Sequence, residues 1–208
     1  MDKRFLKTLP VAGVLTGVLV VSAFSILWKH EEIKKGPSAL ELPIYGRVPG
    51  FKLAERSGRQ ITLRDLKGTP WIADFIFTRC AGICPMMTST MNTLAHEMPE
   101  ARFVSFSVDP EYDTPEILAG YAKSYEADGQ RWMFLTGARD TLNDITTELH
   151  MNKIDEPMMH SASFVLIDKA GNVRGYYDSN EAEALQKLKR DYRLLLNREE
   201  IRSQHIRS

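Results

Sequence analysis

The chain has 208 residues, and its 27 basic and 27 acidic side chains balance to a formal net charge of zero. This balance gives no electrostatic reason to expect nucleic acid or an acidic surface as a partner. The sequence contains no internal repeat and no low-complexity tract. These features exclude a repeat architecture and favour a single compact domain.

The N-terminal segment predicts a membrane anchor. Lys3, Arg4 and Lys7 come first, and residues 9–28 then contain no charged side chain. About 20 apolar residues cross the hydrocarbon core of a bilayer, and a basic flank stays in the cytoplasm. We therefore expect a cytoplasmic N-terminus at 1–8, a single-pass helix at 9–28 in the inner (cytoplasmic) membrane, and a periplasmic or otherwise extracytoplasmic remainder.

A cleaved signal peptide is the alternative to this anchor. Residues 21–23, Val-Ser-Ala, offer the small side chains of a cleavage site after a short apolar run. The apolar run continues past them through Phe24 and Leu27, which favours an uncleaved anchor. A lipoprotein is not expected, because Cys80 and Cys84 are the only cysteines and neither lies near this segment.

The remaining chain predicts a linker, one domain and a tail. Residues 29–46 are polar and contain Gly36 and Pro37, so we expect a linker there, followed by a domain at 47–197 and a flexible tail at 198–208. Thr114 is expected to N-cap a helix whose first residue is a proline. The expected elements are a hairpin of 51–53 and 60–63, a loop at 66–69, a strand at 71–77, a helix at 85–98, a strand at 102–108, a helix at 114–125, a strand at 132–135, a helix at 139–149, a second hairpin of 162–168 and 173–177, and a helix at 181–195. This order predicts an α/β thioredoxin-like sandwich with a central mixed sheet.

The two cysteines lie where the predicted strand at 71–77 meets the predicted helix at 85–98. A helix N-terminus stabilises a thiolate, which we expect at Cys84. The pattern leaves two kinds of chemistry open, which are the redox chemistry of a dithiol and the binding of a soft metal ion such as Cu(I). An inert disulfide between Cys80 and Cys84 would close too short a loop to stabilise much, and a structural zinc site would need four ligands.

His160 is the candidate for a third ligand. It precedes the predicted strand at 162–168, and in a thioredoxin-like fold the loop before that strand faces the cysteine turn. The other histidines fall in the linker, in the tail or in and beside predicted helices: His30, His205, His96 and His150. Four methionines flank both halves of the site and are read as packing residues or as soft thioether ligands: Met86, Met87, Met158 and Met159.

Three segments together resemble the Sco/SenC family. They are residues 74–80 continuing to Cys84-Pro85, the segment 107–110 (Ser-Val-Asp-Pro) with 113–115 (Asp-Thr-Pro), and His160 before an apolar strand. The resemblance runs over about 48–192. It implies a membrane-anchored copper chaperone with a thioredoxin fold, which helps to assemble the binuclear copper centre of cytochrome c oxidase. By the same resemblance, Cys80, Cys84 and His160 would be the copper ligands.

Two positions near the site qualify the resemblance. Many members have a proline directly after the first cysteine, whereas this chain has Ala81 and Gly82. The departure leaves the ligands in place and makes the loop more flexible. Asp109 resembles an acidic position that family members carry near the site, and hydrogen bonding within its own loop is the alternative role.

The expected function is therefore that of a metallochaperone rather than an enzyme. Its cargo would be copper, as Cu(I) or Cu(II), and its partners the apo form of the copper-bearing oxidase subunit and other periplasmic copper chaperones or thiol reductants. The alternative is a periplasmic thiol-disulfide oxidoreductase, in which Cys80 and Cys84 would be catalytic and would keep client cysteines reduced.

Overall fold

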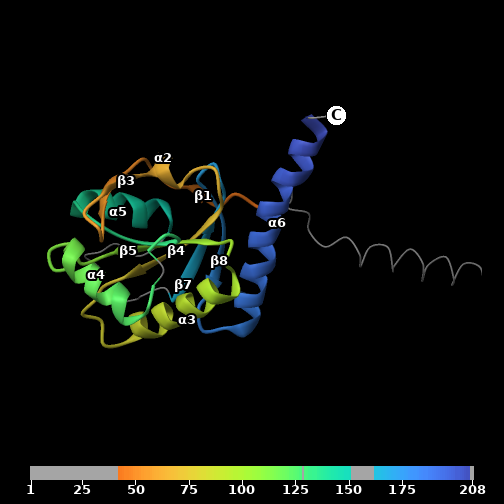
Figure 1. Cartoon of the computed structure of the whole chain (residues 1–208). Helices are drawn as coiled ribbons and strands as arrows, with labels where there is room; N and C mark the ends of the chain where they lie inside the picture. The colour runs from red at the N-terminus through yellow and green to blue at the C-terminus, as the bar shows by residue number, and fades with distance from the viewer. Residues whose placement is uncertain (1–41, 128, 151–161, 207–208) are drawn as a thin grey trace, which may run out of the picture. The chain divides into compact units, whose positions relative to one another are not determined.

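The computed structural model describes residues 42–127, 129–150 and 162–206 (Figure 1). These residues belong to one compact unit, Glu41–Ser208. The predicted anchor at 9–28 and the predicted ligand His160 lie outside the described residues. Among the helices that are described, none has the length and apolar character needed to cross a membrane.

Strands and helices alternate along the described chain. In chain order they are β1 (Gly46–Arg47), β2 (Lys52–Glu55), β3 (Gln60–Thr62), α2 (Leu63–Leu66), β4 (Trp71–Ile76), α3 (Ile83–Glu97), β5 (Arg102–Ser107), α4 (Pro115–Ser124), β6 (Trp132–Thr136), α5 (Arg139–Glu148), β7 (Ser163–Ile167), β8 (Asn172–Asp178) and α6 (Ala182–Ile206). The strands form one sheet in the order β1-β8-β7-β4-β5-β6-β2-β3.

The sheet is mixed. The neighbours β4, β5 and β6 run parallel to one another. All other neighbouring strands pair antiparallel. Strand β4 lies between β5 and β7 near the middle of the sheet, with Asp74 opposite Ser105 of β5 and Ala73 opposite Val165 of β7. The loop that carries the cysteines therefore leaves the sheet from a central strand.

Each face of the sheet has its own apolar core, because side chains along a strand alternate between the two faces. Ile72 and Ile76 of β4 pack with buried residues of α3, α4 and α6. Trp71 and Ala73 pack on the other face with buried residues of α2, α5, β2 and β3. Helices thus cover both faces of the sheet (Figure 1), which is the predicted α/β thioredoxin-like arrangement.

Most predicted elements are confirmed to within two residues at each end. Both hairpins form, with β2 paired to β3 and β7 paired to β8. Thr114 caps α4 as expected, since its hydroxyl accepts a hydrogen bond from the Ile117 N–H at 3.4 Å and Pro115 is the first helical residue. In the second hairpin, Gly171 has a φ of 89°, a conformation that glycine adopts without strain.

The structure differs from the sequence-based elements in three places. A short helix, α2, comes just before the expected loop at 66–69, because Thr62 and Asp65 form a capping box in which the Thr62 N–H donates to Asp65 Oδ2 at 2.7 Å. Strand β1 lies at the boundary where only a linker was expected. Helix α6 continues to Ile206, beyond the expected end at Leu195.

Candidate metal and thiol site

The two cysteines lie on either side of the start of α3. Strand β4 ends at Ile76, the chain turns, and α3 begins at Ile83. Cys80 is in the turn and Cys84 is in the first turn of the helix. Both are free thiols, and their exposed fractions are only 8% and 1%. The structure thus places two reduced sulfurs together beneath the surface.

Cys80 is the more acidic thiol of the pair. Burial disfavours its ionised form, but hydrogen bonds from the backbone N–H groups of residues 82–84 and from the Cys84 thiol outweigh burial, so the pKa of Cys80 lies below its ordinary value. The first N–H groups of a helix have no partner inside the helix. Here they act on the sulfur that precedes the helix.

Cys84 has the opposite tendency. Burial, with smaller contributions from the neighbouring Cys80 and Asp74, raises its pKa to about 12, while a backbone hydrogen bond from Phe77 works against the rise. The expectation of a thiolate at Cys84 in the metal-free protein is therefore wrong. The helix N-terminus does favour a thiolate, but Cys80 receives that effect because the sulfur of Cys84 points into the apolar layer beneath α3.

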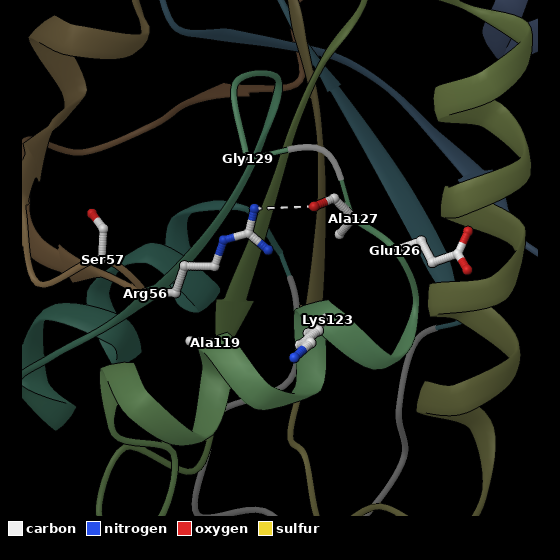
Figure 2. Close-up of a pocket in the computed structure, with 7 residues that line it drawn as sticks. All are labelled: Arg56, Ser57, Ala119, Lys123, Glu126, Ala127 and Gly129. Carbon is white, nitrogen blue, oxygen red and sulfur yellow. Dashed lines mark hydrogen bonds between the residues drawn. The ribbon is translucent and has the colours of Figure 1, made fainter.

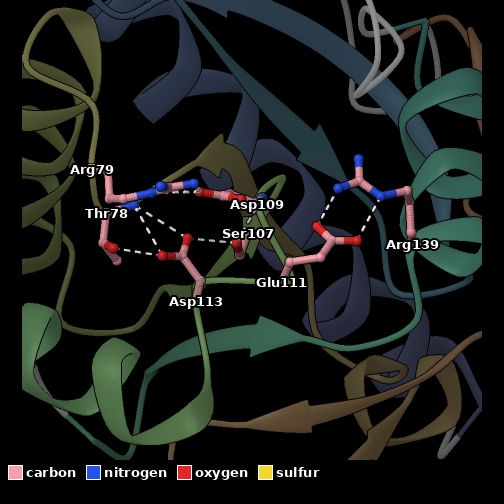
Figure 3. A network of polar contacts seen from close by, with 7 residues as sticks. All are labelled: Thr78, Arg79, Ser107, Asp109, Glu111, Asp113 and Arg139. Atoms are coloured by element: carbon pink, nitrogen blue, oxygen red, sulfur yellow. Dashed lines mark hydrogen bonds and ion pairs between the residues drawn. The ribbon is translucent and has the colours of Figure 1, made fainter.

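The turn before Cys80 is held by a buried carboxylate. Asp113 has no exposed surface, and it accepts hydrogen bonds from the Thr78 N–H at 3.2 Å, the Thr78 hydroxyl at 2.5 Å and the Ser107 hydroxyl at 2.6 Å (Figure 3). Thr78 lies two residues before Cys80. Asp113 therefore fixes the backbone from which the first cysteine projects.

A second contact joins the same two loops on the surface. Arg79 donates to Asp109 Oδ2 through Nε at 2.9 Å, and its guanidinium lies 4.3 Å from the ring centre of Tyr112. On the other side of the loop, Glu111 pairs with Arg139 of α5 (Figure 3). Arg79 is thus engaged by Asp109 and Tyr112, and Asp109 reaches across to the cysteine turn besides accepting N–H bonds within its own loop.

A hollow of about 560 Å³ opens beside Cys80. Its lining includes residues of the cysteine turn and one residue from the start of the β7 region, Ala162. The remaining lining residues are Phe77, Arg79, Ala81, Gly82 and Ile83. The hollow therefore joins the cysteine turn to the chain segment that follows His160 in sequence.

The described histidines lie elsewhere. His96 is in the last turn of α3, and His150 follows α5 and lies near Gly46 of β1. No group of three metal-binding side chains occurs within residues 42–127, 129–150 and 162–206, a part of the chain that lacks His160. Met87 is buried in the core beneath α3, whereas Met86 is 56% exposed. Met158 and Met159 lie outside the described residues.

A second hollow, of about 730 Å³, lies between the end of α4 and the turn after β2 (Figure 2). Arg56 extends across it and donates to the carbonyl oxygens of Ala127 at 3.2 Å and Trp132 at 3.3 Å. The same guanidinium lies 5.2 Å from the ring centre of Phe134. Arg56 thus joins two loops, and among the residues that the structure describes this hollow shares no lining residue with the one beside Cys80.

Sequence reasoning missed two buried aspartates near the cysteines. Asp113 was read only as part of a motif, and its role depends on partners up to 35 positions away in sequence. Asp74 was read only as a member of a strand and of the segment 74–80 that carries the resemblance. A charged residue inside an apolar strand was itself a signal, because aspartate is seldom fully buried without a partner.

Comparison with known proteins points to one family. The chain matches the family model described as SCO1/SenC over residues 46–193. It is 33% identical over 156 residues to the SCO1 protein homolog of Bacillus subtilis, which covers 70% of this chain and 81% of that protein. It is 26% identical over 185 residues to a protein of Stutzerimonas stutzeri provisionally named as copper-binding, covering 81% of this chain and 89% of that protein.

Two solved structures have the same fold. A SCO1/SenC family lipoprotein from Bacillus anthracis superposes with a TM-score of 0.67 at 31% identity, over 73% of this chain and 96% of that one. The second is BsSco, described as a member of the Sco family of cytochrome c oxidase assembly proteins with a disulfide switch. It superposes with a TM-score of 0.61 at 30% identity, over 72% of this chain and 95% of that one. With a family model matched over most of the folded unit, the chain belongs to the SCO1/SenC family.

Proposed function

We propose that this protein is a membrane-anchored copper chaperone. It binds copper as cargo through Cys80, Cys84 and His160, and it delivers the metal to the binuclear copper centre of cytochrome c oxidase. The observation that carries this proposal is the pair of free, buried thiols at the start of α3, on a turn that Asp113 holds in place. Thiolates are the ligands that Cu(I) prefers.

Chain connectivity supports His160 as the third ligand. Ala162 lines the hollow beside Cys80, and its carbonyl oxygen accepts a hydrogen bond from the Ser179 N–H at 2.7 Å. Two residues span at most about 7 Å of extended chain. The imidazole of His160 is therefore within reach of the hollow that the Cys80 side chain lines.

The relatives support copper as the cargo and the oxidase as the client. One relative is named as copper-binding, and BsSco is described as a cytochrome c oxidase assembly protein. A site of two sulfurs and one nitrogen leaves a coordination position open, which allows the metal to pass to a client by ligand exchange. The copper-bearing subunit in its apo form is the proposed acceptor.

The proposed setting is the inner membrane, with the folded domain outside the cytoplasm. The uncharged run at 9–28 would be the single-pass anchor, 29–46 the linker and 47–197 the copper-binding domain, followed by a C-terminal segment into which α6 continues as far as Ile206. The positive flank at 1–8 supports a cytoplasmic N-terminus.

A thiol-disulfide reductase is the second candidate, because the two thiols differ in acidity. The Cys80 thiolate would attack a client disulfide, form a mixed disulfide and release one client thiolate. Cys84 would then lose its proton and attack Cys80, releasing the second client thiolate, so that the client is reduced and the pair is oxidised. BsSco is described as having a disulfide switch, which keeps this activity open for its relatives.

Copper affinity of histidine variants tests the proposal. The reduced full-length protein in detergent is titrated with Cu(I) against a chromophoric chelator, comparing His160→Ala with His96→Ala. We expect one copper per chain, a large loss of affinity in the first variant and none in the second, because His96 lies in the last turn of α3, away from the N-terminal turn that holds Cys84. Equal affinity in both variants would refute the three-ligand site.

The same variants separate the two candidate functions. A copper chaperone that is not a reductase loses client loading in His160→Ala and shows no reduction of an oxidised client peptide. If His160→Ala still reduces the peptide while loading fails, the two roles are distinct and the reductase is a real second activity.

A further inference from the structure

Two hydroxyl groups join α3 to α4 at the backbone of Cys84. The Thr88 hydroxyl donates to the Cys84 carbonyl oxygen at 2.9 Å, and it lies 2.8 Å from the hydroxyl of Tyr121 on α4. A hydroxyl has one proton, which Thr88 gives to the carbonyl, so the phenol of Tyr121 is the donor in the second bond. Thr88 has no exposed surface. The backbone at Cys84 is therefore tied, through one buried side chain, to a different helix.

The phenol at the far end of this link is itself fixed by packing. The ring centre of Tyr121 lies 5.0 Å from that of Tyr125 and 6.2 Å from that of Phe134 on β6. Its neighbour on α4, Leu118, is fully buried in the core layer that also contains Cys84. Because close-packed side chains move little, Tyr121 is a rigid support for Thr88.

The other end of α4 contacts the chain before the first cysteine. Asp113 lies two positions before the start of α4, and it accepts a hydrogen bond from the Thr78 N–H at 3.2 Å (Figure 3). Thr78 in turn lies two residues before Cys80. Tyr121 comes eight positions after Asp113 in sequence, and a helix advances about 1.5 Å per residue. The two ends of α4 thus hold the two cysteine-bearing segments at different points.

The turn between the cysteines contributes little stiffness of its own. Ala81 and Gly82 are both exposed, and neither has a side chain long enough to lock the turn. Glycine also has more backbone freedom than any other residue. The separation of the Cys80 and Cys84 backbones therefore depends on the two contacts with α4.

We propose that Thr88 and Tyr121 are positioning residues for the copper site. They complete a brace, residues 113–121 of α4 and the loop before it, which fixes the backbone at Cys84 relative to the backbone before Cys80. The two thiols are then arranged before the metal arrives, so that binding does not have to order the turn. The inference rests on the proposed function, in which both cysteines bind copper.

Thr88→Val tests the brace, because it keeps the branched shape of the side chain and removes the hydroxyl. The Cu(I) affinity of the reduced full-length protein in detergent is measured by chelator competition. We expect an affinity about fivefold below that of the wild type, which corresponds to the loss of one hydrogen bond. Thr88→Ser keeps the hydroxyl and should restore the wild-type affinity, although its side chain is smaller.

Thr93→Val is the matched control. The Thr93 hydroxyl donates to the Ser89 carbonyl oxygen at 3.1 Å, which is the same bond within α3 on its exposed side. This variant should bind Cu(I) as the wild type does. Tyr121→Phe keeps the bond from Thr88 to Cys84 and removes only the link to α4, so it should weaken binding as Thr88→Val does. Equal losses in the two valine variants, or no loss in either, would overturn the proposal.

Thermal melts establish that each variant is folded at the temperature of the measurement. If Thr88→Val does not fold, the comparison of Tyr121→Phe with Thr93→Val decides by itself.

The equilibrium between dithiol and disulfide gives a readout without copper. Metal-free protein is equilibrated with mixtures of reduced and oxidised glutathione, and the joined form is counted by mass spectrometry after alkylation of free thiols. Oxidised glutathione accepts the two electrons and both thiol protons. The sulfurs must leave their places in the dithiol to reach a separation of about 2.05 Å, which the brace resists. Thr88→Val should therefore form the disulfide at a severalfold lower ratio of oxidised to reduced glutathione, and Thr93→Val at the wild-type ratio.

The two measurements separate this inference from the proposed function. Equal glutathione equilibria in the wild type, Thr88→Val and Tyr121→Phe would contradict the brace while copper binding stands. A wild-type protein that binds no copper would refute the proposed function, and the glutathione equilibria would still decide whether α4 positions the two thiols.

Discussion

The two sides of β4 differ in chemistry although they belong to one strand. On the side that faces α5, Trp71 and Phe75 surround Phe106 of β5, with ring centres 6.3 and 5.4 Å away. On the side that faces α3, Ile72 and Ile76 flank the unpaired carboxylate of Asp74. The α5 side is filled by aromatic packing, and the α3 side contains an unpaired buried carboxylate.

The difference indicates which side serves stability and which serves function. Aromatic clusters stabilise a core through buried area and ring geometry. An unpaired buried acid does the reverse, and natural proteins retain such groups mainly at functional sites. The unpaired carboxylate lies on the side where Cys84 is buried, so stability is lost on the side where the chemistry is expected.

Removing the aromatic centre should have the largest effect. Phe106→Ala leaves a cavity between Phe51, Trp71 and Phe75, and we expect a loss of about 3 to 5 kcal/mol of unfolding free energy. Urea unfolding at several pH values measures it. The loss should not depend on pH, because no ionisable group belongs to this cluster. A strong pH dependence would contradict the difference proposed between the two sides of β4.

Replacing Asp74 with a neutral side chain should remove a pH dependence of the unfolding free energy that arises on the α3 side of β4. Its pKa is raised by burial from 3.8 to about 7, so the folded state binds the proton more tightly than the unfolded state. Wild-type stability should therefore fall as pH rises from about 4 to about 7, by up to roughly 4 kcal/mol from this group, and then level off. Asp74→Asn should lack this fall.

Asp113→Asn is the matched control for that experiment, since it alters a buried aspartate whose oxygens have partners. Urea unfolding of both variants from pH 4 to 8 is compared with the wild type. If Asp74→Asn retains the full decline, the carboxylate is not the group responsible.

Releasing the cysteine turn should have an intermediate effect. Asp113→Ala leaves the Thr78 N–H and the Thr78 and Ser107 hydroxyls without their acceptor, and we expect a loss of about 1 to 3 kcal/mol. The variant should also bind Cu(I) more weakly, because Cys80 would no longer be held in register with Cys84. Chelator competition measures the second effect, and a destabilised variant with unchanged affinity would show that the turn does not position the thiols.

The smallest effect is expected at Tyr121. Tyr121→Phe removes one hydrogen bond to Thr88, whose hydroxyl keeps its bond to the Cys84 carbonyl. We expect a loss of about 1 kcal/mol, measured by thermal melting. A loss several times larger would mean that the phenol also stabilises the α3 side of β4, where Asp74 lies, through contacts beyond this hydrogen bond.

Much of the fold could be predicted from local signals. The apolar run at 71–77, the turn before Gly171 and the Thr114-Pro115 cap each act through neighbours in sequence, and each was read correctly. The position of both cysteines at the strand-to-helix junction followed from the same signals.

The remaining features depend on contacts between distant segments. Which cysteine ionises first depends on where the N–H groups of 82–84 point and on what buries Cys84, neither of which is visible in the spacing. The hydrogen bond from the Thr78 N–H to Asp113 joins loops that lie 35 positions apart in sequence. The third ligand, His160, stays a prediction that rests on topology and on the nearness of Ala162 to the hollow.

X-ray absorption at the copper edge of the Cu(I)-loaded full-length protein tests the central claim most directly. The account predicts two sulfur neighbours and one nitrogen neighbour per copper, with one sulfur lost in Cys84→Ser and the nitrogen lost in His160→Ala. A wild-type spectrum with fewer than two sulfur neighbours, or one unchanged by Cys84→Ser, would contradict the proposed site.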